Sequence, residues 1–287
     1  MKGWLIVNGF IGSDKFREIY GDLARAAAKL DILLEIKASD MFTAPIGEKL
    51  LEDDIPDFVL FWDKDVHLAR RLESEGVRLF NSARAVEICD SKMLTAEILT
   101  EKLSTPKTLL SPKTFEGIGY NSLKFVENAA DILGLPMIIK EEYGSFGAQV
   151  YLARTLDEAK DITRSLGYKG FVMQEFIKES EGRDVRVNVI GDSVISAMER
   201  YNEKDFRSNI SNGGSMRRIE LPKKFAEAAV RACEIIGLDF AGVDILFGKN
   251  GPVVCEVNSN PHFKSSLECT GVDMSEEIMK YIAEQIK

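Results

Sequence analysis

The first 90 residues alternate between apolar runs of strand length and amphipathic stretches of helical period. Buried strands are predicted at the apolar runs, which lie at residues 4–7, 32–36, 58–62 and 77–80. Helices are predicted at residues 14–30 and 65–75, where apolar side chains recur on one face. Repeated strand–helix units favour a parallel sheet with helices on both faces. Ligands bind beyond the carboxyl ends of such strands, which here are residues 8–10, 63–64 and 81–82.

After residue 90 strands and helices follow in a less regular order. Asp90 is the predicted N-cap of a helix that continues through Ser91 and Lys92. Strands are predicted at residues 107–110, 135–140, 149–152, 171–177, 184–190 and 194–200. Helices are predicted at residues 122–133 and 157–166, from Pro222 onward, and from about Ser275 onward.

Residues 240–261 contain two apolar, β-branched runs on either side of an Asn-Gly turn signal, which predicts a β-hairpin. Asp244 lies six residues before Asn250 and Glu256 six after it, so the two carboxylates are expected to face each other. Asn258 shares the face of Glu256 because side chains alternate along a strand. Such hard oxygen ligands suit Mg²⁺, usually held together with phosphates. An ordinary edge hairpin with an acidic polar face is the alternative.

Composition narrows the class of protein. The chain has 287 residues, is 45% hydrophobic and 29% charged, and is typical of a soluble globular protein. Its net charge of -9 argues against a general nucleic-acid or anionic-membrane binder. We expect no signal peptide and no membrane span. The cysteines have no CxxC spacing and favour reduced thiols in a cytoplasmic protein: Cys89, Cys233, Cys255 and Cys269.

Two lysines are candidates for phosphate binding. Lys92 lies near the start of a predicted helix, where it either reaches a bound phosphate or is a solvated surface lysine. Lys140 ends an apolar strand and precedes the loop Gly144, Ser145, Phe146 and Gly147. The backbone N–H groups of this loop are able to bind phosphate oxygens, and a flexible hairpin tip is the alternative.

Three arginines precede the acidic hairpin: Arg186, Arg200 and Arg207. Their planar guanidiniums suggest a cleft that handles anions, while a half-exposed strand arginine is the plainer interpretation of Arg186. The apolar end of the strand at residues 171–177 either accepts a flat purine ring or is ordinary core.

In this order the segments resemble the ATP-grasp fold, and the RimK family of carboxylate–amine ligases in particular. The resemblance covers nearly the whole chain. It is carried by residues 81–92, 136–140, 144–147, 173–177, Asp184-x-Arg186, 198–200, 206–209, 213–214, Gly242-Val-Asp244 and Glu256-Val-Asn258. It implies a three-domain α/β architecture with ATP held between the lid and the C-terminal domain. The domains would be an N-terminal parallel α/β domain at residues 1–90, an α+β lid at 91–177 and an α+β metal domain at 178–287.

The resemblance also implies roles for individual residues. Lys92 and Lys140 would hold phosphates, and the 144–147 loop would fold over the triphosphate. The nucleotide set also includes Gln174, Glu175, Phe176, Ile177, Asp184 and Asn209. Asp244, Glu256 and Asn258 would bind Mg²⁺, with Mn²⁺ as the alternative. Arg186 and Arg200 would face the acyl phosphate and the substrate carboxylate, with Arg207 close by.

The implied reaction is ATP-dependent joining of a small-molecule or peptide carboxylate to an amine through an acyl phosphate, with ADP and phosphate released. This chain has Ser259-Asn260-Pro261-His262-Phe263 where many relatives have Ser-Pro-Gly, so glutamate addition is not assumed. A small-molecule kinase on the same scaffold and a non-catalytic ATP-binding module are the alternatives. No nucleic-acid or membrane partner is expected, and the sequence says nothing of the oligomeric state.

Overall fold

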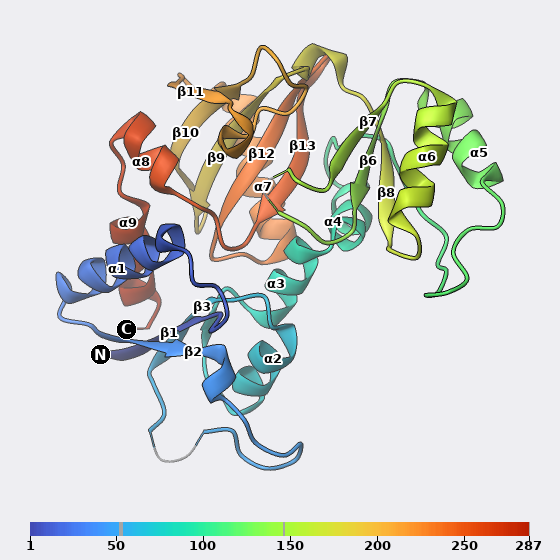
Figure 1. Ribbon diagram of the computed structural model, residues 1–287. Helices are drawn as coiled ribbons and strands as arrows, with labels where there is room; N and C mark the ends of the chain where they lie inside the picture. Colours follow the sequence, from blue (N-terminus) through green and yellow to red (C-terminus); the bar gives the residue numbers. More distant parts are fainter. Residues whose placement is uncertain (52–53, 146, 287) are drawn as a thin grey trace.

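The computed structural model describes residues 1–51, 54–145 and 147–286, and the strands in these ranges form three sheets (Figure 1). The first sheet is parallel, with strand order β2-β1-β3-β4. Its strands are β1 (Lys2–Val7), β2 (Leu33–Ala38), β3 (Phe58–Trp62) and β4 (Leu79–Phe80). From β1 the chain first adds β2 on one side and then β3 and β4 on the other. The topological switch point therefore lies between β1 and β3.

Helices cover both faces of this sheet, as the sequence predicts. Because side chains alternate along β1, Leu5 packs with the helices α1 (Asp14–Ala28) and α9 (Met274–Gln285). Ile6 instead packs with α2 (Val66–Ser74) and α3 (Ala83–Asp90) on the opposite face. The mixed α/β class is confirmed.

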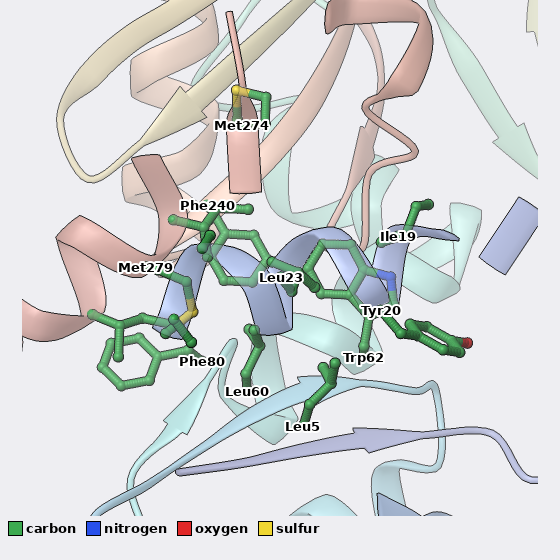
Figure 2. Close-up of a cluster of buried hydrophobic side chains, with 14 of the residues drawn as sticks. Leu5, Ile19, Tyr20, Leu23, Leu60, Trp62, Phe80, Phe240, Met274 and Met279 are labelled. Atoms are coloured by element: carbon green, nitrogen blue, oxygen red, sulfur yellow. The ribbon is translucent and has the colours of Figure 1, made fainter. Parts of the chain in front are cut away.

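The core between this sheet and α1 is shared with the C-terminal part of the chain. Figure 2 shows Leu60 and Trp62 of β3 and Leu23 of α1 in one cluster with Met279 of α9. Phe240, at the start of a C-terminal strand, stacks on Trp62 with ring centroids 5.6 Å apart. The N-terminal sheet is therefore joined to the C-terminal sheet by continuous apolar packing.

The second sheet is antiparallel and has the order β5-β8-β6-β7. Its strands are β5 (Thr108–Leu110), β6 (Met137–Glu141), β7 (Val150–Ala153) and β8 (Phe171–Glu175). The helices α5 (Lys124–Leu133) and α6 (Leu156–Leu166) bury Val126 and Ala159 against it, which gives this sheet a core of its own. We refer to this sheet with α5 and α6 as the lid.

The third sheet is antiparallel, with order β11-β10-β9-β12-β13. Its strands are β9 (Arg183–Ile190), β10 (Ser193–Tyr201), β11 (Ser215–Arg218), β12 (Phe240–Gly248) and β13 (Gly251–Asn258). The helix α7 (Lys223–Ile236) packs apolar side chains on one face, together with α4 (Lys92–Leu99). The other face carries charged side chains. Short elements complete the chain: α8 (Lys264–Thr270), η1 (Ser39–Met41), η2 (Lys178–Ser180) and η3 (Ile210–Asn212).

The predicted helix cap at Asp90 is wrong by one residue. Asp90 ends α3, and the hydroxyl of Ser91 caps α4 by accepting a hydrogen bond from Leu94 N at 3.2 Å. An extended residue at position 91 separates the two short helices. Asp and Ser are both favourable N-cap residues, so the sequence alone does not choose between positions 90 and 91. The predicted hairpins of the third sheet are confirmed by the pairing of β9 with β10 and of β12 with β13.

No helix within the described ranges is both long and apolar enough to cross a membrane. The cysteines at positions 89, 233, 255 and 269 are free thiols.

Candidate active site

The charged face of the third sheet brings together residues from neighbouring strands. Asp244 on β12 lies opposite Glu256 on β13, as the turn at Asn250 predicts, and it also lies opposite Arg186 on β9. The register shifts after Asp244, where Cys255 is inserted in the partner strand. Asn258 follows Glu256 by two residues on β13 and pairs with Gly242. Because side chains alternate along a strand, it shares the face of Glu256, as predicted.

A buried ion-pair network holds the arginines on this face. Arg186 donates two hydrogen bonds to the Asp244 carboxylate, from Nε to Oδ1 and from Nη2 to Oδ2, the second at 2.9 Å. Arg200 Nε lies 2.7 Å from Asp184 Oδ1, and its Nη2 lies 3.0 Å from Asp244 Oδ1. Burial would raise the pKa of Asp244, but the two guanidiniums hold it below its usual value.

The alternative of a half-exposed strand arginine is contradicted for Arg186, because only 11% of its side chain is exposed. Arg200 is buried as well. Both arginines therefore orient the Asp244 carboxylate, in addition to any contact with a substrate anion.

Two lysines lie near Glu256: Lys140 on β6 of the second sheet and Lys92 at the start of α4. Lys140 is buried, and its Nζ lies 3.3 Å from Cys255 Sγ. Lys92 Nζ donates to Gly144 O at 3.1 Å. Burial lowers the pKa of Lys92, with Glu256 opposing this effect and the positive charges of Lys140 and Lys64 adding to it. Clustered lysines are the arrangement expected for a polyphosphate site.

The loop after β6 reaches the third sheet. Arg207 Nη1 donates to Gly147 O at 3.0 Å, and Arg207 is held by Asp205. A Cβ on Gly147 would lie 2.7 Å from Asn209 Oδ1, so the close approach of the loop requires glycine here. The predicted loop residue Phe146 lies outside the described residues. Gly144, Ser145 and Gly147 lie in the loop as expected.

If this loop closes over nucleotide phosphates, MgATP is expected to protect it from proteolysis. Tyr143 is 59% exposed, so we expect chymotrypsin to cut the apo protein after it. Tyr168, which is 49% exposed and follows α6 away from the cavities, is the internal control. MgATP is expected to slow cleavage after Tyr143 and leave cleavage after Tyr168 unchanged. Equal slowing at both sites, or at neither, would contradict closure of the loop.

Two cavities meet at the charged face. The smaller, of about 110 Å³, lies between the lid and the third sheet. It is lined by residues predicted for the nucleotide: Lys140, Gly147, Gln174, Glu175, Phe176, Ile177, Asp184 and Asn209. Arg207, predicted to lie close to the substrate anions, also lines it. Within it, Gln174 Nε2 donates to Thr108 Oγ1 at 2.9 Å, and Glu175 Oε1 accepts from Lys107 N at 2.7 Å. Lys92 lines a neighbouring recess together with Lys140 and Glu256.

The larger cavity, of about 430 Å³, lies where the carboxyl edge of the parallel sheet faces the third sheet. Asn8, Asp63 and Lys64 line it, as the strand-end rule predicts. Asn260 and His262, from the segment that departs from Ser-Pro-Gly, also line it. Side chains that no sequence pattern marks as functional complete the lining: Lys15, Tyr20, Trp62 and Ser265. Burial, followed by the charges of Lys15 and Arg186, lowers the pKa of His262 to about 4, so its ring is neutral at pH 7.

Residues shared by the linings of the two cavities mark the point where they meet: Gly147, Arg200, Asn209, Asp244 and Glu256. The oxygens of Asp244, Glu256 and Asn258 suit Mg²⁺. Asn258 Nδ2 donates to Gly242 O at 3.3 Å, so Oδ1 is the side-chain atom of Asn258 that could contact a metal. No group of three or more His, Cys, Asp or Glu side chains in the described ranges is placed to hold a metal. A metal at this position therefore fits a set completed by the asparagine and by phosphate oxygens.

Comparison with known proteins agrees with this geometry. A model of the RimK-like ATP-grasp domain matches residues 89–282. A probable alpha-L-glutamate ligase of Vibrio atlanticus is 34% identical over 224 residues, covering 77% of this chain and 72% of the relative. A RimK domain ATP-grasp protein from Sphaerobacter thermophilus has a TM-score of 0.74 at 20% identity, covering 98% of this chain and 99% of that chain.

The ATP-grasp ligase PsnB, solved with a minimal precursor, Mg and ADP, has a TM-score of 0.72 at 19% identity, covering 99% of this chain and 98% of that chain. At these identities the two solved structures show the shared fold. The match to residues 89–282, together with the identity to the Vibrio protein, shows the family. The chain therefore belongs to the RimK-like ATP-grasp family of ATP-dependent carboxylate–amine ligases.

Proposed function

We propose that this chain joins an amino-acid or peptide carboxylate to an amine, with ATP consumed and ADP and phosphate released. The observation that carries the proposal is the meeting of the two cavities at Arg200, Asp244 and Glu256. A γ-phosphoryl group in the smaller cavity then lies next to a carboxylate in the larger one. Transfer of a phosphoryl group depends mainly on such positioning and on charge neutralisation.

In the first step a carboxylate oxygen attacks the γ-phosphorus and ADP leaves, which gives an acyl phosphate. In the second step the amine nitrogen attacks the acyl carbon, loses a proton, and phosphate leaves from the tetrahedral anion. Lys92 and Lys140 hold the phosphates, while Gln174, Glu175, Phe176 and Ile177 form the adenine side of the smaller cavity. Arg186, Arg200 and Arg207 orient the anions.

Asp244, Glu256 and Asn258 hold Mg²⁺, which neutralises charge on the transferred phosphoryl group; Mn²⁺ suits the same oxygen ligands. Residues 91–177 form the central domain, which carries the lid, between the domains at residues 1–90 and 178–287; the three sheets support this division. Closure of the lid excludes water from the acyl phosphate. The free thiols support a cytoplasmic location.

The test is a screen of amino-acid pairs with MgATP that follows phosphate release and then the mass of the product. Glutamate belongs in the panel because the Vibrio relative is named as a glutamate ligase. Phosphate release is expected to need both members of a pair, and the product mass to equal their sum less one water. A phosphorylated product without an amide would identify a kinase. Bound ATP with no turnover for any pair would favour a non-catalytic module.

A further inference from the structure

The larger cavity contains a buried carboxylate with one unpartnered oxygen. Asp63 directly follows β3 and is 6% exposed. Its Oδ1 accepts from Lys64 N at 2.6 Å and from Asn8 Nδ2 at 3.3 Å. Its Oδ2 has no hydrogen-bond partner among the described residues. Leaving a charged oxygen buried without a donor is costly, so the site lacks a group that donates to it.

Asn260 supplies a second unpartnered acceptor in the same cavity. Its Nδ2 donates to the backbone oxygen of Asp63 at 3.2 Å, which fixes the orientation of the amide. Its Oδ1 has no partner within the described part of the chain. Both residues line the cavity of about 430 Å³. Two acceptors without a donor specify a ligand that brings N–H groups.

Asp63 and Asn260 are held rigidly at the edge of the parallel sheet where open α/β sheets bind ligands. Asn8 and Asp63 follow β1 and β3, so their hydrogen bond spans the topological switch point. Asn81 Nδ2 ties the parallel sheet to the third sheet by donating to Phe240 O and Ser259 O, each at 2.9 Å. The acceptors are therefore preorganised, and binding requires little ordering of the protein.

The neighbours of Asp63 suit a cation. Burial, followed by the negative charge of Asp63, raises the pKa of Tyr20. Tyr20 and Trp62 both line the cavity, and aromatic rings attract organic cations. Lys15, Lys64 and Arg186 also line the cavity; Lys64 pairs with Asp90 and Arg186 with Asp244. His262 lines it too and is neutral at pH 7. An ammonium group satisfies the carboxylate, the amide oxygen and the rings together.

We propose that Asp63 Oδ2 and Asn260 Oδ1 bind the protonated amino group of an amino-acid substrate. This inference rests on the proposed function and adds a substrate class to it. A nitrogen paired with an ionised carboxylate stays protonated, so the bound group recognises the substrate and is not the attacking amine. The substrate concerned therefore carries a free amino group that the ligation leaves unchanged.

The test measures binding separately from turnover. Calorimetry on the full chain, with and without MgADP, uses the proteinogenic L-amino acids as probes beside their N-acetyl derivatives. At least one amino acid is expected to bind the wild type, and its N-acetyl derivative at least about tenfold more weakly. Asp63→Asn keeps the Oδ1 acceptor and is expected to weaken that amino acid about tenfold or more. Asn260→Ala is expected to weaken it by a smaller factor.

Asp131→Asn on α5 is the matched control, since it removes an exposed carboxylate far from the cavity and is expected to change nothing. The MgADP affinity is expected to be the same in all variants. Equal binding of the N-acetyl derivative, wild-type affinity in Asp63→Asn, or no amino-acid binding to the wild type would each overturn the inference. Absence of MgADP binding would instead count against the proposed function, so the two failures are distinguishable.

Discussion

Glu256→Gln is expected to lower the ligation rate by about a hundredfold or more while the protein stays folded. The substitution keeps the volume of the side chain but removes a charge from the oxygen set opposite Asp244. Glu256 lines both cavities, so the lost charge acts where the phosphoryl group passes between them. Losing one preorganised electrostatic group costs about 10²–10³ in rate in other enzymes. The measurement is the steady-state turnover of the substrate pair at saturating Mg²⁺.

Glu220→Gln is the matched control, because Glu220 is exposed and lies in the segment before α7. It is expected to turn over at the wild-type rate, and both variants to unfold at the wild-type temperature. Near-wild-type turnover of Glu256→Gln at saturating Mg²⁺ would remove Glu256 from the metal site.

Arg200→Lys is expected to cut amide formation by roughly 10²-fold while ATP affinity changes by only a few-fold. Arg200 contacts Asp184 and Asp244 at the same time, and a lysine offers a single point charge in place of this planar fork. The positive charge near the phosphates is kept, but the Asp244 carboxylate loses a partner that orients it. Turnover is compared with nucleotide affinity from calorimetry.

Because Arg200 is buried in an ion-pair network, the same variant is also expected to be less stable, and the assays are made well below its unfolding temperature. Arg231→Lys on the exposed face of α7 is the control for the chemical change alone. Normal ligation by Arg200→Lys, or loss of ATP binding as severe as the loss of ligation, would refute its role in orienting the reacting anions.

The sequence predicts the parts of the fold that depend on local periodicity and on turn chemistry. The turn signal places the hairpin of β12 and β13 correctly, with Gly248 paired to Gly251. Asp244 faces Glu256, as predicted, only because the register shifts at Cys255, and no local signal in the sequence marks this shift. The strand-end rule places Asp63 at a ligand site before any packing is known. The cap of α4 is missed by one residue because Asp90 and Ser91 are adjacent and both residue types are favourable N-caps.

Other features of the site depend on contacts between distant segments. The pairing of Asp244 with both Arg186 and Arg200 follows from the order of β10, β9 and β12, which the sequence does not state. The cavity wall formed by Tyr20, Trp62 and His262 requires α1, β3 and the segment after β13 to meet. No local motif marks such a wall, because its residues belong to separate hydrophobic patterns.

The packing of α9 against α1 has a consequence for the synthesis of the chain. Met274, Ile278 and Met279 of α9 complete the core over one face of the N-terminal sheet. During translation α1 covers only part of this face, and the rest stays uncovered until α9 leaves the ribosome. The lid has its own core and lacks this dependence. The lid is therefore able to fold on the ribosome, while the N-terminal sheet waits for residues synthesised some 200 positions later.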